Sequence, residues 1–104
     1  MYRTVVMLVA LLAPQKHTVE ILSFTATPTH VVPGGTVTLE WTTRGVETVA
    51  LDWMPKGEHS QHRAGLPPSG TLAVQPKVTT RYVLNCEADS GNSCASQSVT
   101  VRVP

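Results

Sequence analysis

The sequence of 104 residues has little charge, and this shortage narrows the functions it can have. Charged residues make up 14% of the chain, and 8 Lys and Arg against 7 Asp and Glu give a formal net charge of +1. The basic residues are scattered along the chain and form no cluster that could hold a phosphate backbone. We therefore expect no nucleic-acid partner.

The chain also lacks a hydrophobic run long enough to cross a bilayer as a helix, which takes about 20 residues. Its longest apolar run covers nine residues, 5–13, and follows a short start that contains Arg3. A basic start before such a run is typical of a secretory signal peptide. We expect no transmembrane span.

The end of this apolar run is unfavourable for signal cleavage. Leu11 would occupy the −3 position, where a small residue is preferred, and Pro14 directly follows the run. Because residues 4–12 are rich in β-branched side chains, the alternative is an additional strand. We assign residues 1–17 to an apolar N-terminal segment, either signal-like or an extra strand, and residues 18–104 to one domain.

From residue 18 onward, apolar and polar residues alternate in short runs separated by Pro and Gly. The clearest run places Val37, Leu39 and Trp41 on one face, with polar residues on the other. A break in phase near Ser23 predicts a bulge, and Pro28 predicts an edge position or a change of sheet. Six or seven such runs, about ten to twelve residues apart, predict an all-β antiparallel sandwich.

The least regular part of this domain is residues 55–70, for which we expect a long loop with at most a short edge strand. The other runs supply the inward-facing rows. The predicted core consists of Phe24, Val37, Leu39, Trp41, Leu51, Leu72, Val74, Tyr82, Leu84, Val99 and Val101.

Five of these runs, in their order, resemble the bacterial immunoglobulin-like (Ig-like) domains of secreted and cell-surface proteins. They are ILSFTATP (21–28), PGGTVTLEW (33–41), SGTLAVQP (69–76), TTRYVL (79–84) and SVTVRV (98–103). The resemblance covers residues 20–103 and implies an Ig-like sandwich of about seven strands, with no shared catalytic site. The usual role of such a domain is a spacer, scaffold or adhesion module.

The TTRY sequence also looks like a tyrosine corner, in which the Tyr82 hydroxyl would hydrogen-bond to backbone just upstream. The chain departs from the family pattern in its apolar N-terminal segment, its cysteine pair and the sequence of residues 53–62. It also appears as a single domain and not in tandem.

Residues 53–62 offer the strongest candidate for a metal site. Imidazole and thioether groups of His59, His62 and Met54 would suit copper, and the two histidines with Glu58 could hold zinc. This HxxH spacing is common in solvated polar loops, and further ligands would have to come from elsewhere. We expect no metal and no cofactor.

Trp53 and Met54 are the candidate residues for a ligand contact. Trp53 is expected near the end of a strand, where its ring could stack on a sugar or a partner protein. The alternative, which we favour, is that Trp53 continues the inward row of Val49 and Leu51, because one aromatic ring does not make a binding platform.

No pattern in the chain indicates catalysis. No serine lies in a G-x-S-x-G turn, and no Ser, His and Asp set is indicated by spacing. A reactive thiol needs a neighbouring cation or a helix N-terminus, whereas Cys86 is followed by Glu87. We therefore expect no enzyme.

The two cysteines, Cys86 and Cys94, are eight positions apart and fit a disulfide across a hairpin with the loop 89–91. Such a bond implies an oxidising compartment. An uninterrupted register from this pair would set Tyr82 opposite Ser98 and turn the last valines away from the core. We therefore expect a bulge between Ala95 and Ser98, or else a disulfide on the outer face.

Taken together, these patterns predict a non-catalytic structural or interaction module that is secreted, periplasmic or on the cell surface. Its partner would be a protein or a cell-surface glycan. One alternative is a filament or surface-layer subunit that forms homo-oligomers by donating residues 4–13 as a strand to a neighbour. Another is a weak carbohydrate or metal binder that uses residues 53–62.

Overall fold

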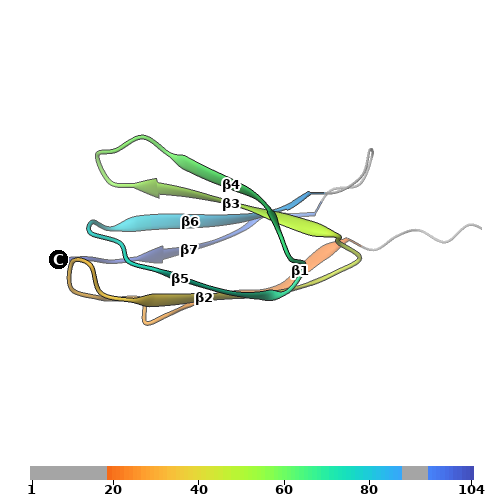
Figure 1. Cartoon of the computed structure of the whole chain (residues 1–104), viewed down its shortest axis with the longest axis horizontal. Helices are drawn as coiled ribbons and strands as arrows, with labels where there is room; N and C mark the ends of the chain where they lie inside the picture. Colours follow the sequence, from red (N-terminus) through yellow and green to blue (C-terminus); the bar gives the residue numbers. More distant parts are fainter. Residues whose placement is uncertain (1–18, 88–93) are drawn as a thin grey trace, which may run out of the picture.

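The computed structural model describes residues 19–87 and 94–104, which form a seven-stranded antiparallel β-sandwich without helix (Figure 1). Its sheets have the orders β1-β2-β5 and β4-β3-β6-β7. The all-β sandwich that the sequence predicts is thereby confirmed. The strands are β1 (Glu20–Thr27), β2 (Val37–Arg44), β3 (Thr48–Pro55), β4 (Gln61–Leu66), β5 (Gly70–Val74), β6 (Thr80–Glu87) and β7 (Gln97–Val101).

The core lies between the sheets and is built from the alternating rows seen in the sequence. In β2, Val37, Leu39 and Trp41 are at most 1% exposed, and the residues between them are exposed. Every predicted core residue is buried or packs half-buried against the core, as Leu72 and Val99 do. The buried cluster consists of Ile21, Phe24, Ala26, Val37, Leu39, Trp41, Val49, Leu51, Leu66, Tyr82, Leu84 and Val101.

Strand β1 contains the bulge that the phase break predicts. Ile21 pairs with Thr43, but Ser23 pairs with Thr42, so Leu22 is an extra residue. Leu22 is 50% exposed, and Phe24 beyond it is again buried. One additional residue thus keeps the apolar row of β1 on the core side.

The chain changes sheet after Pro28, one of the two outcomes expected for this residue. β1 ends at Thr27, and the Thr27–Pro28 peptide bond is cis. Beyond it, Arg102 N donates to Thr29 O (2.8 Å), and Val31 N donates to Arg102 O (3.1 Å). Residues 29–31 therefore run beside the end of β7 and connect the two sheets along this side.

The pairing of β7 with β6 is shifted by one residue from the register that the cysteine pair would set, as the apolar pattern of β7 requires. Leu84 pairs with Gln97, and Tyr82 pairs with Val99. One residue separates Leu84 from Cys86, whereas two residues, 95 and 96, separate Cys94 from Gln97. The extra residue lies in the expected region and lets Val99 and Val101 face the core. The expected hairpin loop, 89–91, is outside the described residues.

Leu39→Ala should lower the free energy of unfolding by about 2–5 kcal/mol, because Leu39 is fully buried between the sheets and its loss leaves a cavity. Urea denaturation followed by intrinsic tryptophan fluorescence measures the change. Thr38→Ala is the matched control, since the exposed Thr38 lies one position earlier on the same strand, and it should cost about 1 kcal/mol or less. Equal effects of the two substitutions would contradict the assigned faces of β2.

Candidate functional site

The candidate ligand residues 53–62 form the end of β3, the turn after it and the start of β4. Trp53 is half-buried and packs against the core, whereas the next residue, Met54, is 36% exposed on the outer face. His59 lies exposed in the turn, and His62 lies on β4 opposite Asp52. The structure therefore separates Trp53 from Met54, because neighbouring side chains on a strand point to opposite faces.

His62 belongs to a polar cluster on the outer face of the four-stranded sheet. Its Nδ1 contacts Asp52 Oδ1, and Asn85 Nδ2 donates to the other carboxylate oxygen, Asp52 Oδ2 (2.9 Å). The cluster ties β4, β3 and β6 together across three strands. It leaves His62 with one ring nitrogen, Nε2, for any further contact.

Asp52 and Asn85 were not predicted from the sequence as members of a cluster with His62. The only local signal is that Asp52 interrupts the apolar run from Val49 to Met54. Within residues 19–87 and 94–104, no three His, Cys, Asp or Glu side chains are close enough to share a metal ion.

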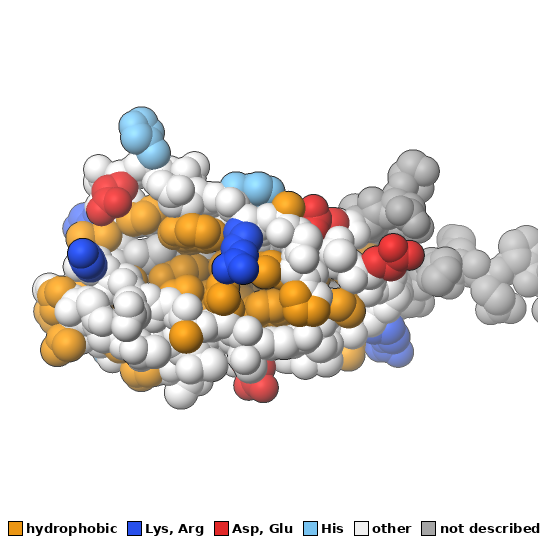
Figure 2. Space-filling model, in the orientation of Figure 1, with side chains coloured by type: hydrophobic (Ala, Val, Ile, Leu, Met, Phe, Trp, Pro, Cys, Tyr) orange, Lys and Arg blue, Asp and Glu red, His pale blue; other side chains and the backbone are white. Residues whose placement is uncertain are grey.

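A groove of about 400 Å³ lies between the edge strands β5 and β4. Figure 2 shows apolar side chains exposed in a band between the two sheets. Trp53 and Tyr82 line the groove from the four-stranded sheet, and Leu72 and Val74 line it from β5. Its charged lining residues are Glu58, Arg63 and Lys77.

The groove lies on this side because the sandwich is closed on the other. At the β1 and β7 side, residues 29–31 and the Gln97 side chain connect the sheets, and Gln97 Nε2 donates to Ile21 O (2.9 Å). At the β4 and β5 side, residues 75–79 cross from β5 to β6 at one end of the groove, and the short connection 67–69 crosses from β4 to β5 at the other. Trp41 Nε1 donates to Pro67 O (2.9 Å), which fixes this crossing at one end of the groove.

Tyr82 is only 3% exposed, although it lines the groove. Burial raises the pKa of its phenol, and a hydrogen bond with the Thr80 side chain partly offsets this increase. No hydrogen bond from the Tyr82 hydroxyl to a backbone group is found among the residues that the structure describes, so the expected tyrosine corner is not seen there. Thr79 makes a backbone link instead: its Oγ1 accepts from Val103 N (3.0 Å) and donates to Val103 O (3.2 Å).

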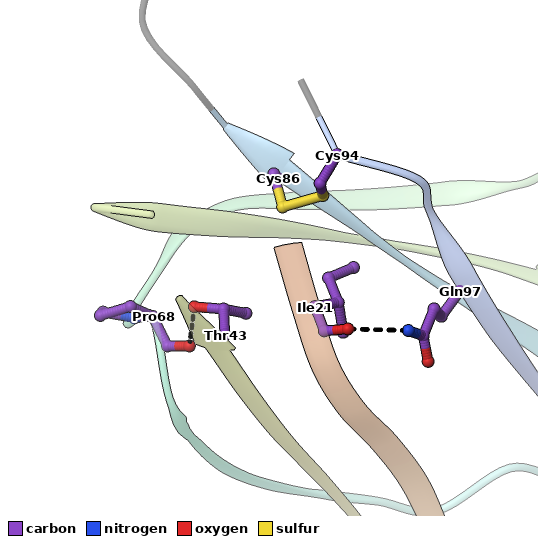
Figure 3. The surroundings of a disulfide bond; sticks show 6 residues. All are labelled: Ile21, Thr43, Pro68, Cys86, Cys94 and Gln97. Carbon is purple, nitrogen blue, oxygen red and sulfur yellow. Dashed lines mark hydrogen bonds between the residues drawn. A yellow bond between two sulfur atoms is a disulfide. The ribbon is translucent and has the colours of Figure 1, made fainter. Parts of the chain in front are cut away.

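The two cysteines form a disulfide at the end of the sandwich where β1 begins (Figure 3). The Cα atoms of Cys86 and Cys94 are 5.8 Å apart, and both side chains pack half-buried against the core. The Gln97 to Ile21 hydrogen bond lies close by in the same view. Covalent and polar links thus meet at this end of the sandwich.

No family model matches the chain. A protein of Ruminiclostridium cellulolyticum, described as an uncharacterized protein, is 33% identical to it over 84 residues. The similar region covers 81% of this chain but 21% of that protein, so the chain spans about a fifth of the relative's length. A sequence similar to this one is therefore part of a longer protein.

Across the part of the chain that the structure describes, we find no helix with the length and apolar character needed to span a membrane.

Replacing both cysteines by serine should lower the free energy of unfolding by about 2.5 kcal/mol, the loop-closure entropy of a bridge with this short separation. Urea denaturation of the double variant and of the oxidised parent chain measures the difference. The parent chain in reductant is the control and should lose a similar amount. A double variant as stable as the oxidised chain would show that the bond contributes nothing to stability.

The buried Tyr82 phenol should make the fold sensitive to alkali. Since its folded pKa is raised above the ordinary value of 10.0, its contribution to stability is fully present below that pH. The contribution is then lost as the pH rises through the folded pKa, because only the unfolded chain ionises readily. Unfolding measured between neutral pH and pH of about 11 should show this loss. Tyr82→Phe should flatten the profile, and an unchanged profile would contradict the assignment to Tyr82.

Proposed function

We propose that this chain is an Ig-like structural or interaction module that works outside the cytoplasm and catalyses no reaction. The observation that carries the proposal is the disulfide between Cys86 and Cys94. Disulfides persist in oxidising compartments and are rare in the cytosol. The compartments that fit are the periplasm, the cell surface and the medium.

The strand order supports the Ig-like part of the proposal. An Ig sandwich places its first, second and fifth strands, A, B and E, in one sheet, and C, F and G in the other. Here β1, β2 and β5 share one sheet, and β3, β6 and β7 share the other with β4 added at its edge. The chain order of the strands therefore fits this topology.

The similarity to part of a longer protein supports the idea of a module. A sandwich with a rigid core can hold neighbouring segments at a fixed distance and present its loops and edges to a partner, which needs no reactive group. The partner would be a protein or a cell-surface glycan, as expected for an adhesion module.

The geometry gives less support to carbohydrate or metal binding through residues 53–62. Trp53 and Met54 point to opposite faces of β3, so they do not form one ligand site. Nδ1 of His62 is engaged by Asp52, and His59 lies in the exposed turn. A sugar or metal ion could therefore contact only one of these side chains at a time.

The test is expression of the whole chain in a bacterium, followed by separation of cytoplasm, periplasm and medium. We expect the chain outside the cytoplasm, with an intact mass that shows the loss of two hydrogens from the cysteine thiols. The Cys86→Ser, Cys94→Ser double variant is the control for the mass assignment. A chain that stays in the cytoplasm with two free thiols would refute the proposal.

A further inference from the structure

Within residues 19–87 and 94–104, no strand lies beside β5 on the side away from β2. In a seven-stranded Ig constant-type domain, the fourth strand pairs with the fifth, in the sheet order ABED. Here the fourth strand, β4, pairs with β3 in the opposite sheet, and β5 ends its own sheet. In the part of the chain that the structure describes, the backbone of β5 therefore pairs on the β2 side only.

Strand β5 also lacks the features that usually protect an edge from pairing. Its five residues, GTLAV, contain no charge, no proline and no bulge. The other edge of the groove is different, because β4 carries Arg63 and a register shift near Gly65, whose φ is +74°. An uncharged, regular edge is a template for another strand.

Next to this edge, the groove offers apolar contacts for one face of an added strand. Leu72 and Val74 of β5 are half-buried, and Trp53 also packs only half-buried on the core. A strand paired with β5 would lay alternate side chains against these three residues. The occupant that fits is an extended segment with a row of apolar side chains.

The chain contains one such segment outside the described residues. Residues 4–13, TVVMLVALLA, hold ten residues without charge or proline, and four of them are Thr or Val. At about 3.3 Å per residue, an extended segment of this length is about 33 Å long. Residues 72–78, which border the groove at β5 and beyond, extend over at most about 23 Å, so about seven of the ten residues would line the groove.

We propose that the groove between β5 and β4 binds residues 4–13 of a second copy of this chain as an added strand on β5. This deepens the proposed function, because it specifies the interaction surface of the module and its partner. The contact is directional: each copy has one donor segment and one acceptor groove. Repeated binding then gives chains of copies, and reciprocal binding gives a closed dimer.

A second copy fits this role better than the segment's own domain. Glu20, at the start of β1, pairs with Arg44 of β2, whereas Gly70, at the start of β5, pairs with Trp41. Along β2, the start of β5 therefore lies three residues, or about 10 Å, from the start of β1. Together with three strand spacings of about 4.8 Å, the straight path from Glu20 to the far side of β5 is about 17 Å. The seven steps from Ala13 to Glu20 span about 25 Å at most, which leaves only about 8 Å for the detour around the ends of β2 and β5.

The proposal requires that the donor segment stays on the chain. Two sequence features favour this, namely Leu11 at the −3 position and Pro14 after the apolar run. The mature N-terminus distinguishes the two proposals. An exported, disulfide-bonded chain that starts after Ala13 would overturn the donor strand and leave the proposed function intact.

The decisive experiment uses the full chain, made by cell-free synthesis under oxidising conditions so that no signal peptidase acts. Light scattering after size exclusion should show dimers or larger species. Single lysine substitutions along the donor then test for a strand: Val6→Lys and Leu8→Lys probe one face, and Met7→Lys and Val9→Lys probe the other. One pair should weaken association by about tenfold or more, since it buries a charge, and the other pair should have little effect.

The acceptor side is tested by Val74→Lys, which places a charge in the groove, against Thr71→Lys on the exposed face of the same strand. Only Val74→Lys should abolish association. Its intact disulfide and its thermal unfolding transition would show that the variant still folds.

A photo-cross-linker is placed at residue 8 of an unlabelled chain, which is then mixed with an isotope-labelled chain. Cross-links should join residue 8 of the unlabelled chain to residues 71–78 of the labelled chain. A monomeric parent chain, equal effects of all four donor substitutions, or cross-links confined to one chain would overturn the proposal.

Discussion

The structure depends on one constraint, the period of two that sends successive side chains of a strand to opposite faces. An apolar row that slips by one residue turns to solvent, and two irregularities here restore such a row to the core. Leu22 does this in β1, and residues 95 and 96 do it before β7. A third shift occurs in the pairing of β3 with β4, where Gly65 takes a positive φ and its N–H donates to Glu87 Oε1 (2.7 Å).

This constraint is also why much of the fold could be predicted from the sequence. Rows such as Val37, Leu39 and Trp41 are local patterns, and burying them on one face requires a sheet. The offset before β7 was predictable because two local patterns, the cysteine pair and the last valines, disagreed by one residue. The contact of His62 with Asp52 and Asn85 was not, because Asn85 is 33 positions from Asp52 and polar pairs leave no periodic pattern.

The placement of β4 could not be predicted either, and the groove depends on it. Five of the six residues of β4 are exposed, so its sequence has no apolar row to show which sheet it joins. Its position follows from pairing with β3 and from the buried Leu66 at its end. With β4 in the four-stranded sheet, β5 becomes an edge and the half-buried side chains of Leu72 and Val74 line an opening.

The parallel bridge between residues 29–31 and Arg102 also determines how the sandwich would carry a pulling force. The described chain enters at the start of β1 and leaves at the opposite end of the sandwich, near the C-terminus (Figure 1). Tension between these ends acts along the strands, perpendicular to the ladder hydrogen bonds of β1 with β2. The bonds of Arg102 to Thr29 and Val31 lie in the same path. They are loaded together in shear and cannot open one at a time, a geometry that resists extension.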